Sequence, residues 1–233
     1  MQATIKAKRE VAVDTLRVEF HVENRPEFKP GQFINLAIPK LKHHDERGNS
    51  RFFSIVNPPY EEGITITTRL TGSGFKRTLQ EMGIGDRVEI AAIMGSFMLP
   101  TDNAVPIVMI AGGIGITPFM SMIKHVLHEK TKHTITLIYS NRNKESAAYL
   151  DELQLLSAQN PKFELIATMT KDEAWLGVKG FVDSDFIRQH ISDHKNKLFM
   201  VVGTPIMMEA VKASLEQLNI AKNNIMTEGF SGY

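Results

Sequence analysis

The sequence contains no cysteine among its 233 residues. Without a thiolate, the chain cannot form a disulfide, a cysteine-ligated zinc site, a nucleophilic cysteine or an iron–sulfur cluster held only by cysteines. Any chemistry that these residues perform must therefore rest on other side chains or on a bound organic cofactor.

An excess of charge of one sign is also lacking, because 27 Lys and Arg residues oppose 26 Asp and Glu residues. We therefore expect neither nucleic acid nor a membrane surface as a partner. No stretch approaches the roughly 18 apolar residues of a membrane span, and residues 1–20 lack the continuous apolar core of a signal peptide. These absences favour a cytoplasmic protein that acts on small molecules.

Up to about residue 100, short β-type runs alternate with turns rich in Pro, Gly, Asn and Asp. The runs lie at 4–13, 15–22, 32–39, 51–56, 63–70 and 86–93. One short helical segment, 75–82, interrupts them. This pattern predicts an antiparallel six-stranded β-barrel over residues 1–101.

Beyond residue 101 the pattern changes, because near-continuous apolar strands now alternate with amphipathic helices. The alternation predicts a parallel five-stranded sheet covered on both faces, over residues 102–233. In the first of these helices we expect Thr117 as the N-cap and Pro118 as the first helical residue.

A glycine-rich turn joins the apolar strand 107–111 to that helix. It contains Gly112, Gly113 and Gly115. Glycines let the backbone approach a ligand closely, and the free N–H groups at a helix N-terminus bind phosphate, so the turn is a candidate pyrophosphate site. Pro118 stands where the standard dinucleotide pattern has its third glycine. The alternative is a tight turn that needs glycine and binds nothing.

The next strand ends at Ser140 and is followed by Arg142 and Lys144. A protein selective for NAD would place an acidic residue near this point to bind the adenine ribose. A hydroxyl and two cations instead favour the 2′-phosphate of NADPH over NADH. A solvated pair of loop cations is the alternative.

A second candidate site lies in the barrel region. Strand alternation puts Arg51 and Phe53 on one face, where a cation could hold a phosphate and a ring could contact a planar heterocycle. Lys76, near the start of the short helix, adds another positive charge. The alternative is a surface cation beside a core phenylalanine. The loop at 43–46, which contains two histidines and two acids, is interpreted as a solvated turn and not as a metal site.

In these motifs and in their order, the sequence resembles the ferredoxin–NADP reductase superfamily. Members have an N-terminal FAD-binding barrel and a C-terminal NAD(P)-binding α/β domain. The motifs that carry the resemblance are 30–33, 51–54, 85–88, 95–97, 113–118, 203–207 and 228–230. Phe53 stands where the family has Tyr, and Val202 precedes Gly203 where the family has Cys, so the family's thiol beside the nicotinamide is absent.

The resemblance implies two cofactors and a set of residues for each. For FAD, the implied contacts lie in the first half: Arg51, Phe53, Ser54, Thr67, Arg69, Gly74, Phe75 and Lys76. For the nicotinamide dinucleotide they lie in the second half: Gly112, Gly113, Gly115, Thr117, Ser140, Arg142, Gly203, Pro205 and Met207. Near the C-terminus, three further residues would lie beside the flavin ring: Glu228, Phe230 and Tyr233.

The resemblance also implies individual roles. Arg51 would hold the FAD diphosphate, Phe53 would pack against the flavin ring and Ser54 would hydrogen-bond near flavin N5. Ser54 and Glu228 are the implied catalytic residues.

The activity expected from these motifs is that of an NAD(P)H-dependent flavoprotein reductase. It would pass electrons from FAD to an external acceptor such as ferredoxin, flavodoxin or an oxygenase component. Two alternatives remain open at this point. One is a diaphorase or a reductase of free flavin or ferric complexes, and the other is a flavin-binding regulatory module without turnover.

Overall fold

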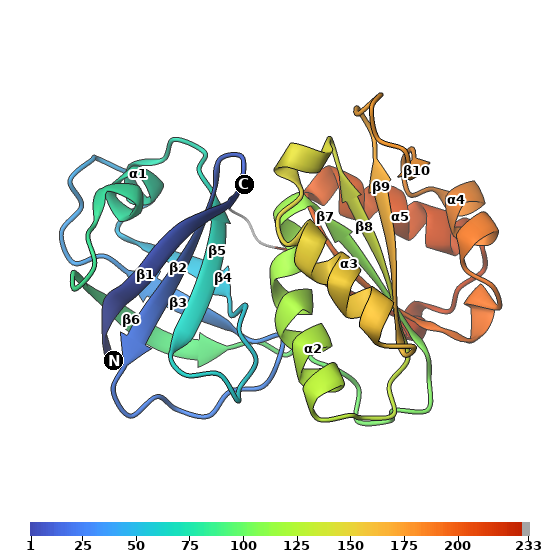
Figure 1. Ribbon diagram of the computed structural model, residues 1–233, viewed down its shortest axis with the longest axis horizontal. Coiled ribbons are helices and arrows are strands. Elements are labelled where there is room, and N and C mark those ends of the chain that lie inside the picture. Colours follow the sequence, from blue (N-terminus) through green and yellow to red (C-terminus); the bar gives the residue numbers. More distant parts are fainter. Residues whose placement is uncertain (230–233) are drawn as a thin grey trace. The chain divides into compact units, whose positions relative to one another are not determined.

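The computed structural model describes residues 1–229, and the chain divides into two compact units, each with its own sheet (Figure 1). The first unit comprises residues 1–99 and 117–125. The second comprises residues 100–116 and 126–229 among those described. No helix within residues 1–229 is long and apolar enough to cross a membrane.

The sheet of the first unit has six antiparallel strands in the order β4-β3-β6-β1-β2-β5. Their bounds are β1 Gln2–Ala12, β2 Thr15–Val22, β3 Phe33–Ala37, β4 Ser50–Ser54, β5 Ile64–Arg69 and β6 Arg87–Met94. Just beyond β4, the Val56 N–H donates to the Thr65 carbonyl of β5 at 2.9 Å, so a backbone bond joins the two edges of the sheet. The six-stranded antiparallel prediction is confirmed.

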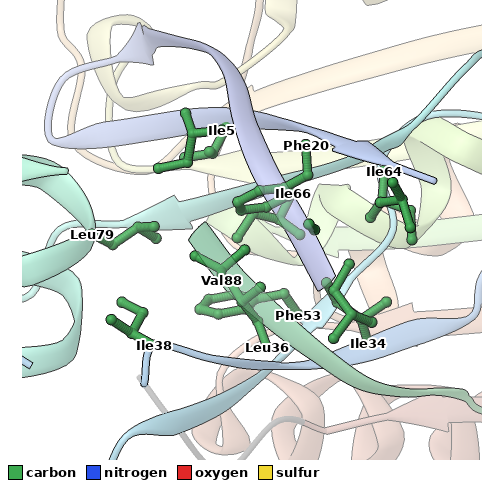
Figure 2. Packing of buried hydrophobic residues seen from close by; sticks show 14 of the residues in the cluster. Ile5, Phe20, Ile34, Leu36, Ile38, Phe53, Ile64, Ile66, Leu79 and Val88 are labelled. Carbon is green, nitrogen blue, oxygen red and sulfur yellow. The ribbon is translucent and has the colours of Figure 1, made fainter. Parts of the chain in front are cut away.

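Alternating apolar residues of these strands fill the interior of the first unit. Ile5, Phe20, Ile34 and Val88 point inward, and Leu79 of helix α1 (Gly74–Glu81) packs against them (Figure 2). The helix starts where it does because the Ser73 hydroxyl accepts the N–H of residue 76 at 3.3 Å, which is the bond that an N-cap makes.

The sheet of the second unit has six parallel strands among the described residues, in the order β10-β9-β8-β7-β11-β12. Their bounds are β7 Ile107–Gly112, β8 Ile135–Asn141, β9 Phe163–Met169, β10 Val178–Lys179, β11 Leu198–Val202 and β12 Ile225–Glu228. The five-stranded prediction was therefore wrong by one strand. The extra strand, β10, has two residues and forms only by pairing with Thr168 and Met169 at the edge, so no periodic pattern marks it in the sequence.

Helices α3 Leu150–Gln159, α4 Ser184–His190 and α5 Pro205–Gln217 pack on this sheet. Helix α2, Ile116–His128, follows β7, and its residues 117–125 belong to the first unit. The short 3₁₀ turns are Gly113–Gly115, Lys144–Ser146, His194–Asn196 and Lys222–Asn224. Apolar residues of α4 and α5 form one core with strand residues such as Ile110 and Val201, and α3 lies in front of the strands in Figure 1.

The prediction of Thr117 as an N-cap was wrong. The turn Gly113–Gly115 winds directly into α2, because the Ile116 N–H donates to the carbonyls of Gly113 and Ile114. Residue 117 is therefore already helical.

Candidate functional site

In the first unit, strand β4 places Arg51 and Phe53 on its inner side, whereas Phe52 is 53% exposed. The buried Arg51 guanidinium donates through Nη1 to the carbonyls of residues 47, 48 and 50. Its Nη2 donates to the carboxylate of Asp45 at 2.5 Å. The alternation that the sequence predicted is confirmed, but the partner of the cation is an acidic residue that sequence reasoning had placed in a solvated turn.

The N-terminus of α1 completes this cluster of charges. Phe75 N–H donates to the second oxygen of Asp45 at 2.8 Å, and the Arg51 guanidinium lies 5.2 Å from the Phe75 ring centroid. Lys76 is buried and donates to Thr71 Oγ1 at 3.2 Å. Burial, followed by the charges of Arg51 and two further arginines, lowers the pKa of Lys76 to about 8. The structure thus brings several predicted FAD contacts into one electropositive site.

Two other predicted FAD contacts lie on β5. Thr67 is buried, and Arg69 at the end of the strand donates to the Val13 carbonyl at 3.0 Å. Arg69 is also one of the charges that lower the pKa of Lys76, so it belongs to the same electropositive site.

Phe53 and Ser54 have different surroundings, although they are neighbours in the chain. The Phe53 ring belongs to the apolar core and lies 6.0 Å from the Phe75 ring centroid, so its flavin contact stays a prediction. Ser54 is 4% exposed, and its Oγ has no hydrogen-bond partner among the residues that the structure describes. A buried hydroxyl without a partner costs about 1–3 kcal/mol, and an unseen ligand is one explanation for such a group.

In the second unit, the predicted contacts gather at the carboxyl edge of the sheet. Gly112 at the end of β7 pairs with Ser140 of β8, and Val202 at the end of β11 pairs with both Ala111 and Glu228. The strand order reverses between β7 and β11, and ligands of open α/β sheets bind at such a switch point.

Glycines line this switch point closely. A Cβ on Gly112 would lie 2.0 Å from the sulfur of Met207, and a Cβ on Gly203 would lie 2.9 Å from the same atom. A Cβ on Gly115 would lie 2.5 Å from the Val202 carbonyl oxygen. Two motifs about 90 residues apart in the sequence therefore meet at one point, and only glycine allows the chain to pack so closely there.

The residues around these glycines set their conformation. Gly113 has a φ of +53°, which glycine adopts readily. Pro205 is the first residue of α5, and Thr204 caps that helix by accepting the N–H of residue 207 at 3.4 Å. Thr117 is buried in α2.

The loop after β8 carries the residues predicted to bind the adenosine end. Ser140 is half-buried and Arg142 is exposed. The Arg142 carbonyl accepts the N–H of Lys171 at 2.8 Å, so a second exposed lysine besides Lys144 lies close to Arg142.

Glu228 is half-buried, and its Oε2 has no hydrogen-bond partner within residues 1–229. Burial raises the pKa of Glu228 to about 7, so this carboxyl can hold a proton near neutral pH. Phe230 and Tyr233, the other predicted C-terminal contacts, lie outside the described residues.

A raised pKa makes the stability of the second unit depend on pH. The Glu228 contribution is fully present below pH 4.5 and is lost as pH rises through about 7. We therefore expect Glu228→Gln to reduce the loss of thermal stability between pH 5 and pH 8. Glu216→Gln, at an exposed position of α5, is the control and should leave that loss unchanged. Parallel pH profiles for the wild type and Glu228→Gln would contradict the assignment.

Comparison with known proteins agrees with this architecture. Residues 109–213 match the family model of the oxidoreductase NAD-binding domain. Reductase component 2 of terephthalate 1,2-dioxygenase from a Comamonas species is 29% identical over 223 residues, which cover 94% of this chain and 64% of that protein. The electron transfer component of toluate 1,2-dioxygenase from Pseudomonas putida is 25% identical over 233 residues, which cover 99% of this chain and 67% of that protein. The chain thus spans about two thirds of the length of these relatives.

Solved structures share the whole fold. The flavohem-like FAD/NAD-binding domain of nitric oxide dioxygenase from Vibrio cholerae has a TM-score of 0.85 at 18% identity, with 98% of both chains covered. A ferredoxin NADP⁺ reductase from Neisseria gonorrhoeae, solved with bound FAD and NADP, has a TM-score of 0.83 at 20% identity, again with 98% of each chain covered. Residues 109–213 therefore match the oxidoreductase NAD-binding domain, and the chain shares its fold with FAD- and NAD(P)-binding proteins such as this ferredoxin NADP⁺ reductase.

Proposed function

We propose that the chain is a cytoplasmic NAD(P)H-dependent flavoprotein reductase, in which residues 1–101 bind FAD and residues 102–233 bind NADPH or NADH. The observation that carries the proposal is the switch point between β7 and β11, where the glycine turn that leads into α2 packs against Gly203 of the turn after β11. The Neisseria structure with FAD and NADP supports the choice of cofactors.

Bound FAD would supply hydride and electron transfer, which the side chains of this protein cannot perform. The protein's part is to bind, orient and hold protons. The residues of the turn after β7 would bind the dinucleotide pyrophosphate through backbone N–H groups. Ser54 would offer to the flavin its buried hydroxyl, which no described residue bonds, and Glu228 would hold a proton at neutral pH.

We further propose that the electrons leave to a separate redox protein, such as ferredoxin, flavodoxin or an oxygenase component. These 233 residues contain no cysteine that could hold an iron–sulfur cluster. Two relatives that align with 94% and 99% of this chain are a reductase component and an electron transfer component of dioxygenases. Both facts favour an external acceptor.

Absorption spectroscopy tests this function directly. The purified chain should take up FAD and acquire a flavin spectrum, and anaerobic NADPH or NADH should then bleach it. Faster turnover with a redox protein than with free flavin, ferric complexes or quinones would distinguish an electron transfer component from a diaphorase. A chain that binds FAD but is not bleached by either nucleotide would be a regulatory module, contrary to the proposal.

The exposed cations beside Ser140 predict a preference for NADPH. Arg142→Ala removes a cation that would pair with the 2′-phosphate, and a charge-assisted hydrogen bond of this kind is worth roughly 1.5 kcal/mol, or about tenfold. We therefore expect KM for NADPH to rise about tenfold while KM for NADH stays the same. Arg188→Ala, at an exposed position of α4, should change neither constant. An equal change for both nucleotides in Arg142→Ala would count against the assignment.

A further inference from the structure

A carboxylate of the chain itself lies where the flavin diphosphate is proposed to bind. Asp45 belongs to the loop between β3 and β4, and its side chain is only 5% exposed. One oxygen accepts from Arg51 and the other accepts from the Phe75 N–H at the start of α1. A guanidinium and a helix N-terminal N–H are donors that a phosphate commonly takes. The anion site of the first unit is thus already filled by an internal anion.

The charge around this carboxylate suits a more highly charged ligand. The Lys76 ammonium is buried, and Arg51, Arg47 and Arg69 are all close enough to disfavour its charged form. Asp45 brings one negative charge to this cluster, whereas a diphosphate brings two. Exchange of the carboxylate for a diphosphate would therefore improve the balance of charge.

The loop that carries Asp45 packs against the first two turns of α1. The backbone N–H groups of Lys42 and His43 donate to Thr78 Oγ1 at 3.1 and 3.3 Å. A Cβ on Gly74 would lie 2.1 Å from the His44 carbonyl oxygen, so the loop backbone lies directly against the helix. The residues that follow Asp45, 46–49, are exposed. The loop is anchored on α1 before Asp45, and after Asp45 it is exposed while the carbonyls of residues 47 and 48 accept from Arg51.

We propose that Asp45 is an internal competitor for the flavin diphosphate. Its carboxylate holds Arg51 and the N-terminus of α1 in the cofactor-free chain, and it leaves when FAD enters. This inference rests on the proposed function for the identity of the ligand. Arg51 exchanges one oxyanion for another, and only hydrogen bonds and ion pairs change. Asp45 thereby lowers the affinity for FAD without affecting riboflavin, which has no phosphate, and so determines flavin selectivity.

Asp45→Asn tests the proposal, and Glu46→Gln is the matched control because it removes the same charge from an exposed neighbour. Cofactor-free wild type and both variants are titrated with FAD and with riboflavin, followed by flavin fluorescence. We expect Asp45→Asn to lower the Kd for FAD by at least about tenfold. The Kd for riboflavin should not change, and Glu46→Gln should match the wild type for both ligands. An unchanged or higher Kd for FAD in Asp45→Asn overturns the proposal.

A second measurement uses the wild type alone. The Arg47 N–H donates to Asp45 Oδ1 at 3.0 Å, so departure of the carboxylate should speed hydrogen exchange at that amide when FAD is added. An Arg47 amide that stays as protected as before, with FAD bound, overturns the inference. Bound FAD that neither NADPH nor NADH reduces contradicts the proposed function but leaves the competition by Asp45 standing. Failure of wild type and Asp45→Asn alike to bind FAD overturns both.

Discussion

Replacement of Arg51 by methionine should destabilise the first unit by about 3 kcal/mol. The guanidinium is buried and donates to Asp45 and to the carbonyls of three loop residues. Methionine fills similar space but donates nothing, so a buried carboxylate loses its cationic partner. The expected loss in the free energy of unfolding is at the low end of the range for a broken buried ion pair, because Asp45 still accepts from the N–H groups of Arg47 and Phe75. Urea unfolding followed by circular dichroism measures the change.

Two further variants separate the ion pair from a general effect of losing an arginine. Arg188→Met removes an exposed arginine that also pairs with an aspartate, and it should cost under about 1 kcal/mol. The double variant Arg51→Met with Asp45→Asn should recover part of the lost stability, because no unpaired charge then remains buried. A cost below about 1 kcal/mol for Arg51→Met would show that the pair contributes little. When FAD binds, we expect Arg51 to keep an anionic partner, since the diphosphate would replace the Asp45 carboxylate.

Ser54→Ala should reduce the rate of flavin reduction about 100-fold without destabilising the cofactor-free chain. The Oγ atom is buried and has no partner among the described residues, so its removal breaks no hydrogen bond within residues 1–229. Loss of one hydroxyl that stabilises charge at the reacting atoms costs about 10²–10³ in rate in comparable sites. Stopped-flow absorbance of the FAD-loaded protein, mixed anaerobically with NADPH or NADH, measures the rate.

Ser121→Ala is the control for this prediction, because Ser121 is a buried serine of the same unit whose hydroxyl has a partner. Its Oγ donates to the Asn57 carbonyl at 2.9 Å. The control should therefore show the opposite pattern, with about 1 kcal/mol of lost stability and little change in the reduction rate. A Ser54→Ala protein that reduces flavin as fast as the wild type would remove Ser54 from the catalytic residues.

Much of the fold followed from patterns within short stretches of sequence. The alternating runs of the first half gave six antiparallel strands, and the apolar runs of the second half gave parallel strands between helices. β10 was not predicted, because a strand of two residues is too short to show an alternating pattern and forms only by pairing with β9. The start of α2 was misplaced by two residues, at Pro118 instead of Ile116, since a 3₁₀ turn that winds into a helix needs no capping side chain.

In the candidate site too, the residues that belong to short local motifs were predicted, whereas contacts between distant segments were not. The glycine turn after β7 and the helix N-terminus at Gly74 can both be recognised from a few consecutive residues. Asp45 gives no such signal, because its contact with Phe75 joins residues 30 positions apart through the path of a loop. The side on which Phe53 lies was predicted, but its packing against Phe75 depends on how the strand and the helix meet.

The sequence by itself determined the types and order of the elements, the glycine turn and the absence of thiol chemistry. These properties depend on residue type and on spacing within a few turns or strands. Only the tertiary structure decided that Gly112 and Gly203 meet at the switch point, that Ser54 is buried with no partner within residues 1–229 and that Asp45 holds Arg51. Such contacts join segments far apart in the chain, and they arise only when the packed sheet and its loops bring those segments together.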